Sequence, residues 1–251
     1  MFNQFKLFDA HLHIIDERFP LFPNQGYLPE SFTCDDYLQR LAAYDLAGGA
    51  VVSGSFQHFD TNYLIDALDK LGENFVGVIN APATISDNEL LALHNAGVRA
   101  LRFNLKRGGS DTCQYLENMA KRVYELVAWH VEMYVDVADL DDLYQIILRL
   151  PAVSIDHLGL SKAGLPTLLK LVEQGVKVKA TGFSRVDFNV TAALQDINSA
   201  NPRALMFGTD LPSTRAPKPY CDEDFLCVIE SVGEEAARAI FYDNAQAFYQ
   251  K

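Results

Sequence analysis

Eight short apolar segments, each followed by a stretch of helical periodicity, constrain the fold of this chain more than any other feature. The segments are rich in Val, Ile, Ala and Phe without strict alternation, as expected of strands buried on both faces. Parallel strands need helical crossovers, so the repeat predicts a parallel sheet covered by helices. The predicted strands are residues 6–13, 49–56, 75–81, 98–105, 131–138, 152–159, 176–183 and 204–211.

The intervening segments carry helix signals. Ser86 is followed three residues later by Glu89, a spacing typical of a capping box at a helix start. Residues 37–48 end in glycines, which predicts that a helix stops there. Helical periodicity also extends over residues 111–130, 139–150, 165–175 and 233–249, and the last of these predicts a helix that closes the domain.

Eight βα units without a long linker, in 251 residues, predict one α/β domain over residues 1–251. The predicted architecture is a (β/α)8 TIM barrel with a C-terminal closing helix. A doubly wound sheet of the same length is the alternative. Such a sheet usually has a glycine-rich phosphate-binding turn after its first strand, and here HLHIID takes that place.

Charge and composition narrow the class of partner. A formal net charge of −12 disfavours binding to nucleic acid or to an anionic membrane. No apolar run approaches the length of a membrane span, and the N-terminus lacks the pattern of a signal peptide. Without a CxxC pair, the cysteines are expected to be free thiols: Cys34, Cys113, Cys221 and Cys227. We therefore expect a cytoplasmic protein, either a monomer or a small homo-oligomer.

Three histidines and an aspartate fall at the predicted strand ends where TIM barrels carry their chemistry. His11 and His13 end the first strand and, as residues i and i+2, share one face. His157 ends the sixth strand and Asp210 the eighth. The first and eighth strands are neighbours in a closed barrel, so we expect these side chains to converge on one site.

Cations gather at the same end of the predicted barrel. Arg102 shares a strand face with Ala100 and Asn104, which would line the barrel interior near its mouth. An acidic chain that concentrates cations at this place is predicted to bind a small anionic metabolite, because guanidinium groups hold carboxylates and phosphates through paired hydrogen bonds. The loop cations on this side are Lys106, Arg107, Arg185, Arg215 and Lys218.

The ordered set DAHLH, GYLP, GSFQHFDTNYLIDAL, GVRALRFNL, IDHLG, TGFSR and GTDLP resembles the amidohydrolase superfamily. The similarity is to the amidohydrolase-2 branch, which contains 2-pyrone-4,6-dicarboxylate lactonase and the sugar lactonases. The resemblance covers essentially the whole chain and implies a (β/α)8 barrel that hydrolyses a lactone ester. It also implies catalytic roles for His11, His13, His157 and Asp210, and binding of the substrate by Tyr27, Ser55, Arg102, Arg107 and Arg185.

Two cofactor alternatives remain open. The fourth strand offers Arg102 and Asn104 but no bridging lysine or glutamate, which argues against two metals, and the fifth strand lacks the histidine of mononuclear relatives. Nearby guanidinium groups would oppose a cation, and the lactonase that the chain resembles works without one. We expect catalysis without a cofactor. The alternative is one divalent metal, Zn or Mn, held by His11, His13, His157 and Asp210.

The resulting hypothesis is a hydrolase that opens a carboxylate-bearing lactone, either 2-pyrone-4,6-dicarboxylate-like or a sugar lactone. Asp210 takes a proton from water, the three histidines stabilise the oxyanion, and Arg102 and Arg185 hold the substrate carboxylates. One alternative is a metal-dependent amidohydrolase or decarboxylase of the same superfamily acting on another small acid. Another is a barrel that only binds an acidic metabolite, although a general base beside three imidazoles argues against it.

Overall fold

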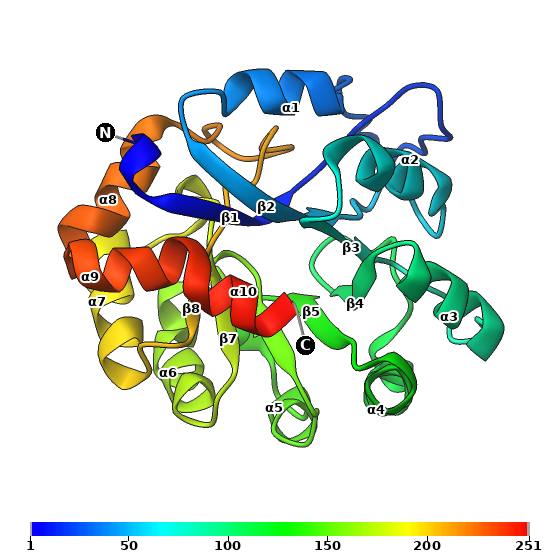
Figure 1. The fold of residues 1–251 in the computed structure, drawn as a ribbon. Coiled ribbons are helices and arrows are strands. Elements are labelled where there is room, and N and C mark those ends of the chain that lie inside the picture. Colours follow the sequence, from blue (N-terminus) through cyan, green and yellow to red (C-terminus); the bar gives the residue numbers. More distant parts are fainter. Residues whose placement is uncertain (1, 250–251) are drawn as a thin grey trace.

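The computed structural model describes residues 2–249 and contains one eight-stranded parallel sheet in which the strands follow their sequence order. Each predicted segment overlaps an observed strand, although the second strand begins at Asp45 rather than at residue 49, and the α/β barrel is confirmed (Figure 1). The strands are β1 Lys6–Leu12, β2 Asp45–Val52, β3 Phe75–Ile79, β4 Val98–Asn104, β5 His130–Tyr134, β6 Val153–Ile155, β7 Lys177–Ala180 and β8 Leu205–Phe207.

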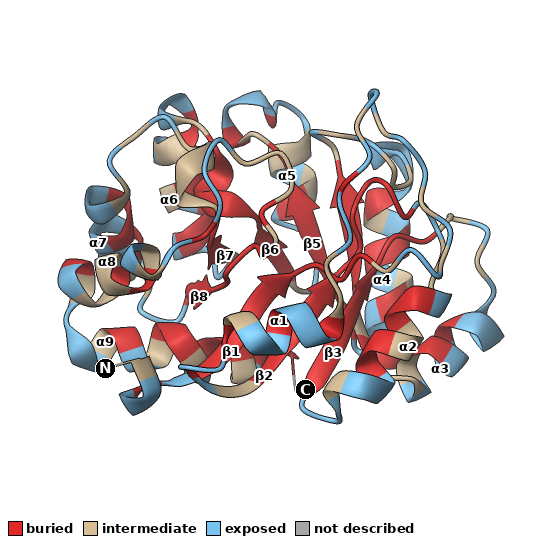
Figure 2. Cartoon of the chain, turned by 90° about the horizontal axis from the view of Figure 1, so that it is seen from above, coloured by how far each residue is buried: buried red, intermediate tan, exposed pale blue. Residues whose placement is uncertain are grey.

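Helices surround the sheet and bury their inner faces against it, while their outer faces are exposed (Figure 2). They are α1 Cys34–Arg40, α2 Asn62–Leu71, α3 Asp87–Asn95, α4 Leu116–Val127, α5 Leu143–Ile147, α6 Leu165–Glu173, α7 Val190–Ala200, α8 Asp222–Val232, α9 Glu234–Arg238 and α10 Asn244–Tyr249. Short 3-10 turns occupy Phe2–Gln4, Cys113–Tyr115, Val137–Asp139, His157–Gly159, Lys162–Gly164 and Phe183–Arg185, and a π turn occupies Ala239–Asp243.

The predicted capping box at α3 is confirmed. The Ser86 hydroxyl accepts a hydrogen bond from the Glu89 backbone N–H at 3.3 Å, and the Glu89 carboxylate accepts from the Ser86 N–H at 2.8 Å. Such a cap typically contributes about 1 kcal/mol to stability. The helix predicted over residues 139–150 is shorter in the structure, where only α5 is helical, and α2, α7 and α8 were not among the predicted helices.

The prediction that a helix ends at the glycines of residues 37–48 is wrong. Helix α1 ends at Arg40, and Gly48 and Gly49 lie inside β2. A Cβ atom on Gly48 would lie 2.3 Å from the backbone oxygen of Asn74, and one on Gly49 would lie 2.9 Å from the backbone oxygen of Asp9. These glycines therefore permit close backbone approach within the sheet rather than ending a helix.

The barrel closes through the segment that follows β8. The Asp210 N–H donates to the His11 carbonyl at 2.7 Å, and the His13 N–H donates to the Leu211 carbonyl at 2.8 Å. A Cβ atom on Gly208 would lie 2.7 Å from the His11 nitrogen, so glycine is needed for this approach. Closure thus fixes the end of β1 against the residues after β8.

The C-terminal helix closes the opposite end of the barrel, as predicted (Figure 1). The Tyr249 ring stacks on Phe8 with centroids 5.3 Å apart, and its hydroxyl donates to the Ala10 carbonyl at 3.2 Å. Phe248 and Ala245 join the same buried cluster as the inner residues of the first strands. All four cysteines are free thiols. Within residues 2–249, every helix is too short or too polar to cross a lipid bilayer.

Candidate active site

The four residues predicted to converge do meet at the C-terminal end of the barrel, and all four are buried. The His11 ring centroid lies 5.0 Å from that of His13 and 5.0 Å from that of His157. Asp210 Oδ1 lies 3.8 Å from His11 Nε2 and 3.7 Å from His13 Nε2. One carboxylate oxygen therefore faces two imidazole nitrogens.

A bulge in β1 aims the two histidines. The pairing with β2 runs from Asp9 opposite Gly49 to Leu12 opposite Val51, so β1 has one extra residue in this interval. Leu12 then packs into the large outer core, while the ring of His11 faces the barrel interior. Bulges commonly redirect side chains in this way next to active sites.

His157 and Asp210 both stand on backbone that non-glycine residues rarely adopt. Their φ angles are 50° and 59°, in the left-handed region, and each residue follows a short strand. Such conformations cost free energy and persist only where the surrounding structure holds them, and they are found most often at functional sites. A Cβ atom on Gly182, after β7, would lie 2.7 Å from His157 Nδ1, so this glycine leaves space for the imidazole.

Arg185 is held by Asp210. Its Nε and Nη2 donate to Asp210 Oδ2 at 2.8 and 2.6 Å, and Nη2 also donates to the Thr214 carbonyl at 2.8 Å. Burial alone would raise the pKa of Asp210, but the Arg185 charge outweighs it and holds that pKa well below its usual range. Asp210 Oδ1, by contrast, accepts no hydrogen bond from residues 2–249.

Arg102 is likewise paired with a carboxylate. Its Nη2 donates to Asp156 Oδ2 at 3.1 Å and its Nη1 to the Ser53 carbonyl at 2.5 Å. Asp156 precedes His157 in the IDHLG motif but was not among the predicted site residues. Its pKa is lowered, because the charges of Lys179 and Arg102 outweigh the effect of burial.

Two further arginines line the pocket, and no carboxylate in the described part of the chain pairs with either of them. Arg107 and Arg215 both line it, and within residues 2–249 no hydrogen bond or ion pair engages the Arg107 guanidinium. Arg215 donates to the side-chain oxygen of Asn24 at 3.1 Å. Burial and the neighbouring Arg107 charge lower the pKa of Arg215. Two adjacent cations of this kind favour an anionic ligand.

Ser55 and Tyr27 differ in their placement. Ser55 lines the pocket together with the arginines and His13. Tyr27 lies under Arg215, whose guanidinium carbon is 4.5 Å from the ring centroid, and is not part of the pocket wall. Lys106, one of the predicted loop cations, pairs with Asp136 at 3.4 Å in the outer part of the mouth.

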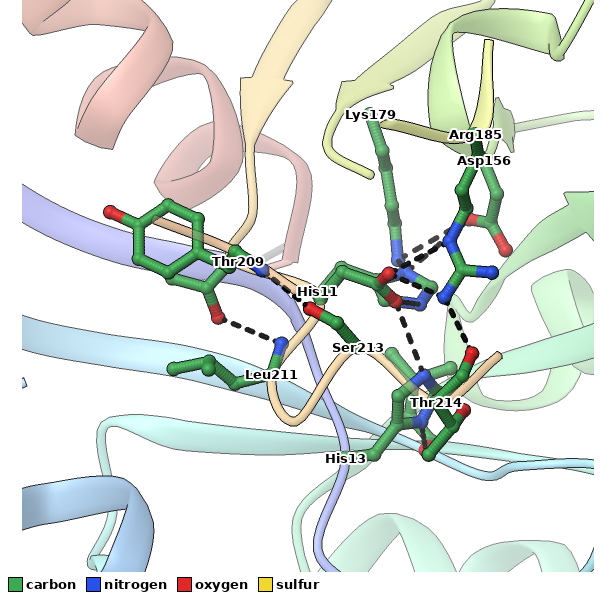
Figure 3. A network of polar contacts seen from close by, with 12 residues as sticks. His11, His13, Asp156, Lys179, Arg185, Thr209, Leu211, Ser213 and Thr214 are labelled. Carbon is green, nitrogen blue, oxygen red and sulfur yellow. Dashed lines mark hydrogen bonds and ion pairs between the residues drawn. The ribbon is translucent and has the colours of Figure 1, made fainter. Parts of the chain in front are cut away.

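A buried charge network beneath the site was not predicted. Lys179 on β7 forms an ion pair with Glu132 on β5, and both side chains are fully buried. The Lys179 side chain reaches toward the ring of His11 (Figure 3). Burial raises the pKa of Glu132, but the Lys179 charge and the His130 hydrogen bond hold it at about 2. The sequence signal was a charged residue inside each of the apolar runs VEMYVDVA and VKVKATGF.

Two groups of side chains at the site bring potential metal-ligating atoms close together. His11, His157 and Asp210 each offer an atom within 4.8 Å of the others, and His11, Glu132 and Asp156 form a second such group. Arg185 already neutralises Asp210, and the ammonium of Lys179 lies against Glu132. Positive charge thus takes the place that a cation would need, and the residues fit a divalent ion poorly.

Residues 8–251 match the family model described as Amidohydrolase. Over 169 residues the chain is 34% identical to a 2-pyrone-4,6-dicarboxylate hydrolase of Comamonas testosteroni, a match covering 62% of this chain and about half (54%) of that relative's length. Over 261 residues it is 26% identical to a 4-sulfomuconolactone hydrolase of Rhizobium radiobacter, covering 94% of this chain and 87% of that protein.

Solved structures support the fold. A crystal structure from Agrobacterium tumefaciens is 21% identical, with a TM-score of 0.85, and the match covers 98% of this chain and 96% of that one. A probable 2-pyrone-4,6-dicarboxylic acid hydrolase from Acinetobacter baumannii, crystallised with citric acid bound, is 20% identical with a TM-score of 0.83, covering 98% and 100%. At these identities the likeness establishes the barrel architecture.

Proposed function

Because this chain belongs to the amidohydrolase family, we propose that it hydrolyses the ester of a small lactone that carries carboxylate groups, such as 2-pyrone-4,6-dicarboxylate. One of the two relatives is named a hydrolase of 2-pyrone-4,6-dicarboxylate, and the other a hydrolase of 4-sulfomuconolactone. The observation that carries the proposal is the position of Asp210 Oδ1. This buried acceptor receives no hydrogen bond from residues 2–249, and it faces His11 and His13 beside two arginines.

Asp210 Oδ1 is the proposed acceptor for a proton of the attacking water. Its distances of 3.7 and 3.8 Å from the imidazole nitrogens are too long for direct hydrogen bonds, so these atoms keep their capacity for water or substrate. A carboxylate with so low a pKa is a weak base while Arg185 holds it. A substrate carboxylate that competes for Arg185 would weaken that hold and raise the basicity of Asp210.

His11 and His157 are proposed to stabilise the developing oxyanion as neutral hydrogen-bond donors. Burial lowers the pKa of His11 well below its usual range, and burial lowers that of His157 to about 4. Both rings are therefore uncharged at neutral pH, and each can donate one hydrogen bond. Donors aimed at the place where charge develops are worth several kcal/mol in a buried site, typically ~3 to 4 each.

Substrate carboxylates are proposed to bind Arg107 and Arg215 first, because no carboxylate of residues 2–249 pairs with these guanidinium groups. Ser55 completes the polar lining together with the Nε of Arg102, which has no hydrogen-bond partner in the described part of the chain. This binding would place the lactone carbonyl over Asp210, which contributes by orientation. Tyr27 would act by holding Arg215 in position.

The proposed reaction needs no metal, because the charges of Arg185, Arg102 and Lys179 already act on the carboxylates of the site. A metal-dependent amidohydrolase or decarboxylase remains the competing class. Loss of activity after chelation, restored by Zn or Mn, would favour that class over the lactonase.

The test is a set of lactones assayed by acid release in a pH-stat. We expect rapid opening of 2-pyrone-4,6-dicarboxylate and much slower opening of a pyrone of the same ring without carboxylates. Carbon dioxide release, measured in the same samples, would identify a decarboxylase instead. Failure to open any carboxylate-bearing lactone, in protein shown to be folded, would refute the proposal.

A further inference from the structure

Lys179 is a fully buried cation whose proposed part so far is only to supply positive charge near the carboxylates of the site. It extends from β7 into the barrel interior beneath the site, where it meets Glu132. Asp156 and His11 also lie beside its ammonium group (Figure 3). Its Nζ forms the ion pair with Glu132 and lies 3.8 Å from Asp156 Oδ1 and 3.3 Å from His11 Nδ1. Burial of a charged lysine is unfavourable unless the ammonium is paired with opposite charge and hydrogen-bonded, as it is here.

The contact with His11 has a defined direction. A lysine ammonium has three donors and no acceptor, so His11 Nδ1 must be the accepting atom. Burial and the Lys179 charge both lower the pKa of His11, so the ring is neutral and carries one proton. With a lone pair at Nδ1, that proton is on Nε2, the nitrogen that faces Asp210 Oδ1.

His13 has the opposite arrangement. Its Nδ1 lies 2.7 Å from the carbonyl oxygen of Val52, which can only accept, so His13 Nδ1 carries a proton. In its neutral form the His13 ring therefore presents an unprotonated Nε2 to the pocket. The two histidines of the HLH motif would then differ in function, one as a donor and the other as an acceptor.

We propose that Lys179 is a positioning residue that fixes His11 with its proton on Nε2, so that His11 donates a hydrogen bond to the reacting oxygen and cannot ligate a metal through that atom. The catalytic part of this inference rests on the proposed lactone hydrolysis, whereas the tautomer and the metal affinity do not. Metal-ligating histidines show the reverse pattern, in which the outer nitrogen donates its N–H to a carboxylate or carbonyl.

Asp156 makes the inference sharply testable, because it is the alternative partner of the same nitrogen. Its Oδ1 lies 3.5 Å from His11 Nδ1 and accepts no hydrogen bond from residues 2–249. When Lys179 is removed, His11 would donate from Nδ1 to Asp156 and expose an unprotonated Nε2. The ring would then match the pattern of a metal ligand.

The first experiment uses the unmodified protein. Long-range ¹H–¹⁵N NMR of protein labelled with ¹⁵N-histidine distinguishes the two neutral tautomers, and the His11 signals are identified by their loss in His11→Gln. We expect the Nε2-protonated form at neutral pH. An Nδ1-protonated His11 would overturn the inference even if the protein hydrolyses lactones.

The second experiment compares two variants that treat Glu132 alike. Lys179→Met combined with Glu132→Gln removes the lysine without leaving its buried carboxylate partner charged, and Glu132→Gln alone is the matched control that keeps Lys179. We expect the double variant to show the Nδ1-protonated form and to bind Zn²⁺ at least about tenfold more tightly in calorimetry than the control. Unchanged tautomer and unchanged zinc affinity would overturn the inference.

Kinetics separate this positioning role from a structural one. Relative to the Glu132→Gln control, the double variant should lose kcat by about 100-fold, the size expected for one oxyanion donor, with KM changed by less than about threefold. Equal kcat values for the two variants would refute the catalytic part. If neither protein opens a lactone, the proposed function fails, while the NMR and zinc results still decide the role of Lys179.

Discussion

Substitution of Asp210 by asparagine replaces one carboxylate oxygen with an amide. Arg185 donates two hydrogen bonds to the Oδ2 position, so the amide oxygen must stay there. The NH₂ group then occupies the Oδ1 position facing His11 and His13, where the proposed mechanism needs an acceptor. General-base catalysis typically contributes 10²–10⁴-fold, so we expect kcat to fall at least about 100-fold, a barrier increase of roughly 3 kcal/mol or more.

KM should change by less than a few-fold, because Arg107 and Arg215 are untouched by this substitution. The assay is the pH-stat rate of opening of 2-pyrone-4,6-dicarboxylate, with thermal unfolding as the check on folding. Asp136→Asn is the matched control, since Asp136 pairs with Lys106 at the outer mouth and should leave kcat near wild type. Retention of more than a tenth of the wild-type kcat by Asp210→Asn would show that Asp210 is not the base.

Three further outcomes are expected. Because the pKa of His157 is about 4, the imidazole stays neutral and kcat should not change with pH between about pH 5.5 and 8. A fall in kcat toward acid pH with an apparent pKa near the usual histidine value would contradict this. Arg107→Met should raise KM for the dicarboxylate at least about tenfold with little change in kcat. Lys106→Met should leave KM unchanged, because Lys106 already pairs with a carboxylate. Equal KM values for the two variants would refute the anion site. Tyr249→Phe removes the donor to Glu132 and should lower the free energy of unfolding by about 1–3 kcal/mol in urea titrations, and no loss would exclude the hydroxyl as a stabilising donor.

The acid dependence of stability follows from Glu132. Its pKa is about 2 in the fold, below the ordinary value of 4.5, so its ionisation stabilises the protein above about pH 4.5 and this contribution is lost as the pH falls toward 2. The difference in unfolding free energy between wild type and Glu132→Gln should therefore be present at pH 7 and shrink below about pH 4. A difference independent of pH would contradict the assignment of Glu132 as a buried carboxylate.

The barrel was predictable because its signals are local. Apolar runs and their intervening helical periods recur eight times, and each predicted strand matches an observed one. The convergence of His11, His13, His157 and Asp210 also followed, since strand ends in a barrel share one rim. What failed was the interpretation of Gly48 as the end of a helix, because the approach of neighbouring backbone to this residue depends on tertiary packing that one sequence does not display.

The carboxylate partners of the arginines could not be predicted from the sequence either, because they also depend on tertiary packing. Arg102 and Arg185 were predicted to bind substrate, and in the fold they pair with Asp156 and Asp210. Among residues 2–249, nothing pairs with the guanidinium of Arg107, which was also predicted to bind substrate. Which carboxylate reaches which guanidinium is decided by loop geometry after the strands. A charged residue inside an apolar strand was nevertheless a readable signal, and Lys179 could have been noted from it.

The central claim is that this barrel opens an acidic lactone with its own side chains. The most direct measurement is the rate at which exhaustively chelated wild-type protein, with its metal content checked, hydrolyses 2-pyrone-4,6-dicarboxylate. We expect the same kcat before and after chelation. Absence of hydrolysis, or a rate that disappears on chelation and returns with a divalent ion, would contradict it.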